Sequence, residues 1–293
     1  MISRKKVVLV GPSGVGKTTL QKVFFEQANP NLLLEEPLQP SRGINSRNYS
    51  INKDDLGIFD LAGQENQIWF SDNGREVFSE SNTIICVFDI RNSLESIIKF
   101  LINIYKMKKD LQLNSCKIIA FLHKIDLRSK LYVYNKLKTI QEFITIQHPQ
   151  GKDFEIYKTS ITKDNFYSTL CIISEILNLI FKKNIISINH KELQRMKKQL
   201  LILINSETNA KYSIDDISQK CKFNIEETKD YIEKLEELGF LEGLDNDRFF
   251  KLTIRADYFK SGLEKDLTNI PNSDLYRKIE FFHFFLYLKE KED

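Results

Sequence analysis

A glycine-rich segment near the start of the chain combines the residue types that bind a polyphosphate. Residues 11–18 read Gly-Pro-Ser-Gly-Val-Gly-Lys-Thr, which fits the pattern GxxxxGK[ST]. Glycines let backbone N–H groups close around phosphates at the start of a helix, Lys17 would reach the β and γ phosphates, and Thr18 would ligate Mg²⁺. The expected phosphate-binding residues are Gly11, Ser13, Gly14, Val15, Gly16, Lys17, Thr18 and Thr19.

A second motif follows a later predicted strand and reads Asp60-Leu-Ala-Gly63-Gln64. Asp60 would end a buried strand beside the glycine-rich segment, where its carboxylate could hold the Mg²⁺ shell through water. Gly63 would place its N–H at the γ-phosphate and move when that phosphate leaves. Gln64 is the candidate that orients the attacking water, so Gln64 and Lys17 are the expected catalytic residues.

A third and a fourth motif would hold the base. His123-Lys124-Ile125-Asp126 follows an apolar run, and a carboxylate at Asp126 would accept from the guanine N1–H and N2 amino group, which adenine lacks. The Lys124 stem can pack along the base. Thr159-Ser160-Ile161 follows the last predicted strand, and its backbone would support the base through Ser160 and Ile161. His123 stands where asparagine is usual, and an exposed imidazole without a role is the alternative.

The switch hydroxyl that completes the Mg²⁺ site is the least obvious element, because no threonine lies between Thr19 and Thr83. Ser41, in Pro-Ser-Arg-Gly-Ile, is the best candidate, since it precedes a predicted strand and supplies the same hydroxyl. Ser46 and Ser50 would lie inside that strand. The expected metal ligands are Thr18, Ser41 and Asp60.

Short apolar runs alternate with helix-length periodic stretches through the first part of the chain, which predicts an α/β fold around a mostly parallel sheet of six strands with helices on both faces. The strands are expected at 5–10, 44–51, 56–60, 83–90, 117–122 and 154–158, and the helices at 17–27, 94–112, 130–147 and 164–183. Residues 28–43, which include Pro30, Pro37, Pro40 and Gly43, are expected to form a long loop.

Taken together, these motifs resemble the Ras superfamily over about 185 residues, and most closely the Rag/Gtr type. Ser13 in the phosphate loop, the His-Lys-x-Asp form of the base motif and Thr-Ser-Ile carry that likeness. The segment around Ser41 looks more like archaeal and Arf- or Gα-related sequences. The resemblance implies a P-loop GTPase domain that binds GTP and GDP with Mg²⁺, hydrolyses GTP slowly until a GTPase-activating protein (GAP) assists, and binds effectors through its switches.

No arginine finger is supplied in cis. In Gα proteins that arginine lies three residues before the switch hydroxyl, where this chain has Leu38. Arg42 lies on the other side of Ser41, and its simplest interpretation is a solvated loop charge.

The second part of the chain predicts a winged-helix-like α+β domain. Helices are expected at 191–205, 214–221 and 225–238 and a hairpin at 240–254, with caps at Ser213, Asn224 and Gly239. The helix 225–238 carries six carboxylates against two lysines, which disfavours nucleic acid and favours a protein partner. The expected domains are 1–185, 190–258 and a helical aromatic tail, 259–293, that packs on the rest or forms a homo- or heterodimer surface.

Composition and termini limit the remaining function classes. The net charge of +3 is too small for non-specific nucleic-acid binding, and 28% charged with 42% hydrophobic residues is ordinary for a globular protein. No signal peptide, lipidation motif or transmembrane run is recognised, so we expect a cytoplasmic protein without a membrane partner. The leading hypothesis is a GTP-hydrolysing switch with a protein-interaction domain. A low-activity nucleotide-binding scaffold and a GTP-regulated DNA-binding protein are the alternatives.

Overall fold

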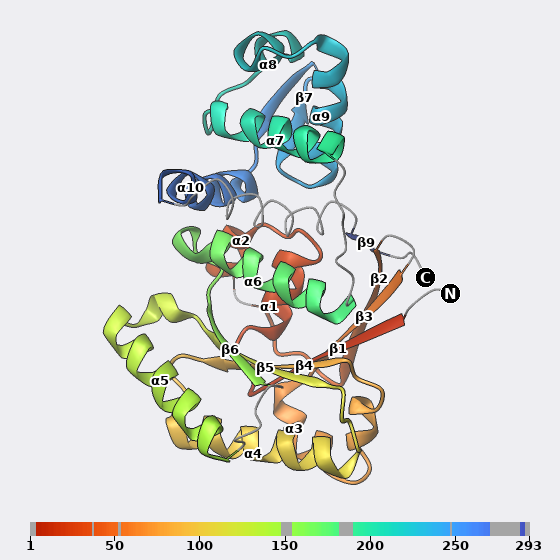
Figure 1. The fold of residues 1–293 in the computed structure, drawn as a ribbon, viewed down its shortest axis with the longest axis vertical. Coiled ribbons are helices and arrows are strands. Elements are labelled where there is room, and N and C mark those ends of the chain that lie inside the picture. The colour runs from red at the N-terminus through yellow and green to blue at the C-terminus, as the bar shows by residue number, and fades with distance from the viewer. Residues whose placement is uncertain are drawn as a thin grey trace. The chain divides into compact units, whose positions relative to one another are not determined.

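The computed structural model in Figure 1 describes residues 4–36, 38–51, 54–147, 154–181, 190–246, 248–269 and 288–290. The chain divides into two compact units. The first comprises residues 1–26, 37–161 and 288–293, and the second comprises residues 27–36 and 162–287.

The described residues of the first unit form a seven-stranded sheet in the order β6-β5-β4-β1-β3-β2-β9. The pairs along β6, β5, β4, β1 and β3 are parallel, whereas β2 pairs antiparallel with both β3 and β9. This confirms the predicted sheet of six strands and adds β9 at its edge. The strands are β1 (Arg4–Val10), β2 (Ile44–Ile51), β3 (Asp54–Leu61), β4 (Thr83–Asp89), β5 (Lys117–His123), β6 (Phe154–Thr159) and β9 (Leu288–Glu290).

Helices cover both faces of this sheet. In Figure 1, α1 (Lys17–Phe24) lies on one face, and α3 (Asn66–Trp69), α4 (Leu94–Asp110) and α5 (Lys130–Gln147) lie on the other. Alternate strand residues such as Val8, Ile84 and Ile118 join buried side chains of α4 and α5 in one core cluster. β4 is buried along its whole length, as expected for a central parallel strand covered on both faces.

The second unit contains α2 (Pro30–Glu35), α6 (Lys163–Phe181) and α10 (Ile254–Asn269). α6 and α10 approach closely: a Cβ on Gly262 would lie 2.2 Å from that of Tyr167. Edge-on aromatic pairs, Phe166 with Tyr258 and Tyr167 with Phe259, also join these two helices. The α6–α10 pairing is therefore built around an aromatic seam that only a glycine at position 262 accommodates.

The rest of the second unit follows the element order of a winged helix. α7 (His190–Asn205), α8 (Ile214–Cys221) and α9 (Ile225–Glu237) precede a hairpin of β7 (Leu241–Leu244) and β8 (Phe249–Leu252). Tyr212, between α7 and α8, makes an antiparallel bridge to Phe250 of β8. Ser213 and Asp216 form a reciprocal capping box on α8, and Gly239, at φ +66°, follows the end of α9.

Four features differ from the sequence-based expectation. α2 lies inside the segment expected to be a loop, and α3 inside the segment after Gln64. α10 continues past residue 258, where the sequence places a domain boundary, and Leu288–Glu290 form a strand rather than a helix. The domain boundaries at 185, 190 and 258 stay predictions, while contact grouping places α6 with the second unit. The aromatic tail between Ser273 and Tyr287 lies outside the described residues.

Candidate functional site

The glycine-rich loop connects the end of β1 to α1 and is tightly confined. Gly16 has φ +103°, and a Cβ there would lie 2.8 Å from Cδ2 of His123. An L side chain at Gly16 would therefore be strained twice, by the backbone conformation and by the imidazole. Val15 is buried, whereas Ser13 and Gly14 are exposed and Thr18 and Thr19 are half-buried, so the loop backbone is open on one side.

Lys17, the first residue of α1, is 6% exposed. Its Nζ donates to the carbonyl oxygens of Gly11 at 2.9 Å and Pro12 at 3.0 Å. Burial lowers the pKa of Lys17 to about 8, against the opposing charge of Asp60. The ammonium is thus held inside the curve of the loop, where a phosphate would compete with the two carbonyls for its protons.

Three oxygen-bearing side chains meet beside this lysine. Thr18 Oγ1 lies 2.9 Å from Ser41 Oγ and donates to Oδ2 of Asp60 in a short hydrogen bond. Asp60 is fully buried, and its Oδ1 has no hydrogen-bond partner among the described residues. Burial raises the pKa of Asp60, opposed by the Thr18 hydrogen bond and the Lys17 charge. Hydroxyl and carboxylate oxygens are the ligands that a hard cation such as Mg²⁺ prefers. The Oδ1 atom of Asp60 is available for such a contact.

The segment after β3 lies against the phosphate loop. A Cβ on Gly63 would come within 2.4 Å of Pro12 C and Ser13 N, so only glycine permits this approach. Asn66 Nδ2 donates to Gly11 O at 3.1 Å, and Glu65 accepts from the Gly43 N–H at 2.9 Å. The Gln64 side chain is exposed next to these anchored residues, and is therefore free to reorient.

The base motif gathers at the ends of β5 and β6. His123 is 2% exposed, and its Nδ1 lies 3.0 Å from Thr159 Oγ1. Burial and the nearby Lys124 lower the pKa of His123 to about 3, so the imidazole is neutral near pH 7 and joins two strand ends. Asp126 is exposed and accepts a short hydrogen bond from Ser160 Oγ, whose residue is buried, as is Ile161.

Comparison with protein-family models matches this chain to the Gtr1/RagA G protein conserved region, over residues 6–233. This match covers most of the chain and includes all four motifs. The chain belongs to the Gtr1/RagA family of G proteins. A search of curated proteins finds no match.

Membership in the Gtr1/RagA family makes GTP binding and GTP hydrolysis the general function of the chain. It confirms the Rag/Gtr resemblance; the archaeal likeness of the Ser41 segment stays a prediction. The matched region ends inside α9, so it includes α7 and α8 of the winged-helix-like part.

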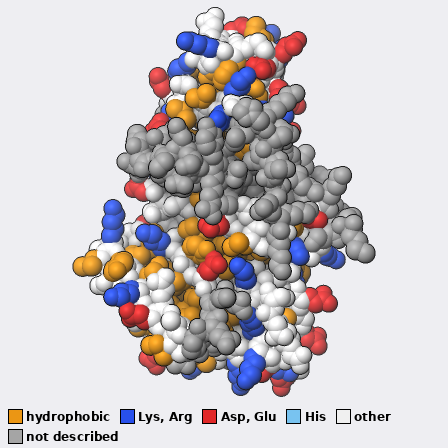
Figure 2. Space-filling view, viewed as in Figure 1, with side chains coloured by type: hydrophobic (Ala, Val, Ile, Leu, Met, Phe, Trp, Pro, Cys, Tyr) orange, Lys and Arg blue, Asp and Glu red, His pale blue; other side chains and the backbone are white. Residues whose placement is uncertain are grey.

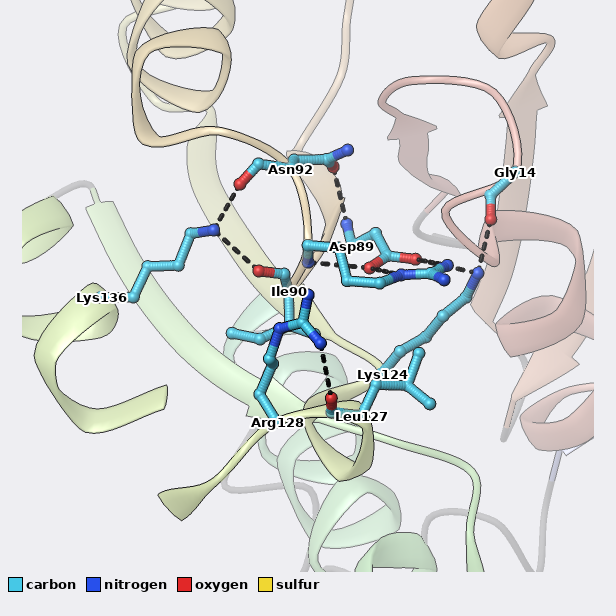
Figure 3. A network of polar contacts seen from close by, with 9 residues as sticks. Gly14, Asp89, Ile90, Asn92, Lys124, Leu127, Arg128 and Lys136 are labelled. Atoms are coloured by element: carbon cyan, nitrogen blue, oxygen red, sulfur yellow. Dashed lines mark hydrogen bonds and ion pairs between the residues drawn. The ribbon is translucent and has the colours of Figure 1, made fainter. Parts of the chain in front are cut away.

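Sequence reasoning missed a carboxylate in this G protein's site. Asp89 ends β4, and its Oδ2 lies 3.1 Å from Nζ of Lys124. The same ammonium donates to Gly14 O at 2.6 Å, and Figure 3 shows Lys124 extending between Gly14 and Asp89. A carboxylate at the end of a buried parallel strand is itself a signal, because ligands of open α/β sheets bind at that edge.

The described residues contain neither a cluster of metal-binding side chains nor a membrane-spanning helix. Across the part of the chain that the structure describes, no group of three or more His, Cys, Asp or Glu side chains is placed to hold a metal ion. Among the described helices, none combines the length and apolar character needed to cross a bilayer.

Proposed function

We propose that this G protein is a molecular switch that binds GTP and GDP at the carboxyl edge of the sheet and hydrolyses GTP slowly. The observation that carries this proposal is the meeting of Thr18, Ser41 and Asp60 beside Lys17. Lys17 and the backbone of residues 13–19 would bind the phosphates. Ser41 belongs to a segment outside the phosphate loop, and its contact with Thr18 supports the proposal that this segment is switch I, which would respond to the bound nucleotide.

Mg²⁺ would be held by Thr18 and Ser41, with Asp60 acting on its water shell. When bound, the ion neutralises charge on the β and γ phosphates. The orphaned Oδ1 of Asp60 supports this assignment, because a buried carboxylate oxygen without a partner is costly. Loss of the γ-phosphate would release Gly63 and Ser41, which is the change that a partner would detect.

Guanine selection would rest on Asp126, which is held by Ser160 and remains exposed. Two hydrogen bonds to a carboxylate contribute about 1.5–3 kcal/mol each, so GDP should bind at least roughly a hundredfold more tightly than ADP. Gln64 would orient the water, with Leu38 where an arginine in cis would be required. Unassisted turnover should then be about 10⁻⁴ to 10⁻³ per second, with a GAP accelerating it.

The test is competition binding with a fluorescent GDP, followed by single-turnover hydrolysis of GTP. Wild-type protein should release the probe to GDP and GTP, and require far higher concentrations of ADP or ATP. Asp126→Asn should move the preference towards xanthine nucleotides. Equal displacement by ADP would refute guanine selection. Binding without measurable hydrolysis would favour the low-activity scaffold, and turnover near one per second would require a catalytic group beyond Gln64.

We further propose that the winged-helix-like part binds a protein rather than a duplex. Two basic residues of α7 are engaged by α9: Arg195 with Asp230 at 2.6 Å and Lys198 with Glu227 at 3.1 Å. Glu226 and Glu233 of α9 remain exposed. On the face shown in Figure 2, basic side chains are interspersed with acidic ones over the described residues. On that face, the described residues therefore form no continuous basic tract of the kind that phosphate binding requires.

The switches offer a second surface for effectors or a GAP. Ile44, at the start of β2, is 47% exposed, and Ile68, in α3, is 51% exposed. Both residues lie within a few positions of groups that would contact the nucleotide, Ser41 and Gly63. A partner that covers these isoleucines would therefore be sensitive to the nucleotide state.

A further inference from the structure

Asp89 contacts two cationic side chains, Arg91 from the turn that follows β4 and Lys124 from the base motif. Its side chain is 7% exposed. Oδ1 accepts from Arg91 Nε at 2.9 Å, and Oδ2 accepts from Arg91 Nη2 at 2.7 Å and lies 3.1 Å from Lys124 Nζ. Burial would raise the pKa of Asp89, but hydrogen bonds from Arg91 and Lys124 outweigh it and hold that pKa well below its usual range. The carboxylate is therefore ionised near neutral pH.

The position of Asp89 is fixed independently of Lys124. The Asp89 N–H donates to Asn92 Oδ1 at 2.9 Å, and the Ile90 N–H donates to His123 O at 2.8 Å. From α5, Lys136 Nζ donates to Ile90 O at 2.7 Å and, in a short hydrogen bond, to Asn92 O. Figure 3 shows the contacts of Asn92 and Lys136 around the turn that follows β4. Asp89 thus presents its carboxylate from a turn secured by two elements.

Lys124 needs such support because of its conformation and its length. Its backbone is left-handed, at φ 59° and ψ 39°, which is uncommon for a residue with a side chain. Its flexible four-carbon stem loses rotamer freedom when it is held in one direction. Gly14 O is a neutral acceptor on one side of the ammonium, and Asp89 is the charged acceptor on the other. The stem between them is the part that would lie along a bound base.

We propose that Asp89 is a positioning residue for the guanine nucleotide: it holds Lys124 across the phosphate loop and so slows nucleotide release. This inference rests on the proposed guanine-nucleotide binding. It assigns to Asp89 a role in retention of the nucleotide, separate from contact with the base, which Asp126 would make. Arg91 keeps Asp89 ionised and oriented, but among the described residues it makes no hydrogen bond or ion pair to the phosphate loop, so its loss should matter less.

The experiment measures release of a fluorescent GDP from the full chain after addition of excess unlabelled GDP. Asp89→Asn keeps the size of the side chain and removes its charge. Release should accelerate roughly tenfold, which corresponds to about 1.4 kcal/mol. Glu142→Gln is the matched control, because it removes an exposed carboxylate of α5 that pairs with Lys138 at 3.8 Å. Release from this control should stay within about twofold of wild type.

A double-mutant cycle separates positioning from a general loss of stability. With Lys124→Met, which removes the ammonium, Asp89→Asn should accelerate release no further. Two outcomes would overturn the proposal: accelerations of release by Asp89→Asn and Lys124→Met that multiply in the double mutant, or an Asp89→Asn release rate within about twofold of wild type.

If Asp89→Asn does not fold, Arg91→Ala and Lys124→Met still decide. If Arg91→Ala and Lys124→Met accelerate GDP release equally, the effect belongs to the turn after β4, and the role of Lys124 is refuted. If Arg91→Ala releases GDP at a near-wild-type rate and Lys124→Met releases it fast, the role of Lys124 is supported. A wild-type chain that fails to retain GDP would refute the proposed function, and this inference with it.

Discussion

Replacing His123 by asparagine should remove a pH-dependent part of the stability of the first unit. His123 is 2% exposed, and burial and the charge of Lys124 lower its pKa from 6.5 to about 3, with Asp89 and Thr159 opposing. Between these two values the unfolded chain binds a proton on this imidazole and the folded chain does not. The contribution is therefore complete above pH 6.5 and is lost as the pH falls from 6.5 towards 3.

The expected size follows from the same two pKa values. At pH 5 the folded imidazole is still neutral, so the loss depends on how far the pH lies below the unfolded pKa of 6.5. About 1.5 pH units at about 1.36 kcal/mol per unit give a loss of about 2 kcal/mol relative to pH 7. Asparagine does not titrate. Between pH 7 and pH 5, the free energy of unfolding of His123→Asn should therefore fall by about 2 kcal/mol less than that of wild type.

The assay is urea unfolding at pH 7 and pH 5, followed by the fluorescence of Trp69. This residue is the one tryptophan of the sequence, is 7% exposed and belongs to the first unit. Its transition therefore reports on the unit that contains His123. Identical pH dependence in wild type and His123→Asn would show that burial does not suppress protonation, and would refute the reasoning.

Two further predictions concern switch I and the second unit. Ser41→Ala should raise roughly tenfold the Mg²⁺ concentration that is needed to slow release of a non-hydrolysable GTP analogue, which corresponds to about 1.4 kcal/mol. Ser41→Thr should restore the wild-type requirement, and an unchanged Mg²⁺ requirement in Ser41→Ala would contradict the ligand assignment. In a gel mobility-shift assay at about 0.1 M salt, the full chain should not bind a random DNA duplex, because binding through the net negative α9 would release few counterions. Salt-sensitive binding that is abolished by Arg248→Ala and Lys251→Ala would instead show that a duplex binds the hairpin.

The elements that sequence patterns predicted well are those with a local signal. The central strands and α5, whose bounds at 130 and 147 agree with the prediction, have clear apolar periodicity. The sequence pattern does not predict α2, because a proline at position 30 is typical of a loop. In fact Asn29 caps this helix by accepting from Asn31 N, and Pro30 occupies its first turn, where a missing N–H has no cost. The Asn-Pro pair was therefore a helix start.

The missed contact between Asp89 and Lys124 depends on strand register, which no local pattern contains. Asp89 pairs with His123 in the parallel register of β4 and β5, so the residue after His123 emerges beside the carboxylate. A motif search finds Lys124 because its neighbours form a recognisable string. It cannot find Asp89, because the two residues become neighbours only once β4 and β5 are aligned.

The sheet topology also explains why Ser41, from a separate segment, reaches Thr18 and Asp60. β1, β3, β4, β5 and β6 are parallel, so the segments that follow them all lie at one edge. β2 runs antiparallel to β3, with Ile44 opposite Leu61, so the amino end of β2 lies at that same edge. Ser41 lies three residues before Ile44, just beyond the edge at which β3 ends with Asp60 and Leu61, and both Ser41 and Asp60 reach Thr18 there. A change in the β2–β3 register would move Ser41 away from Thr18, so this strand pair holds the proposed switch residue beside the proposed Mg²⁺ site.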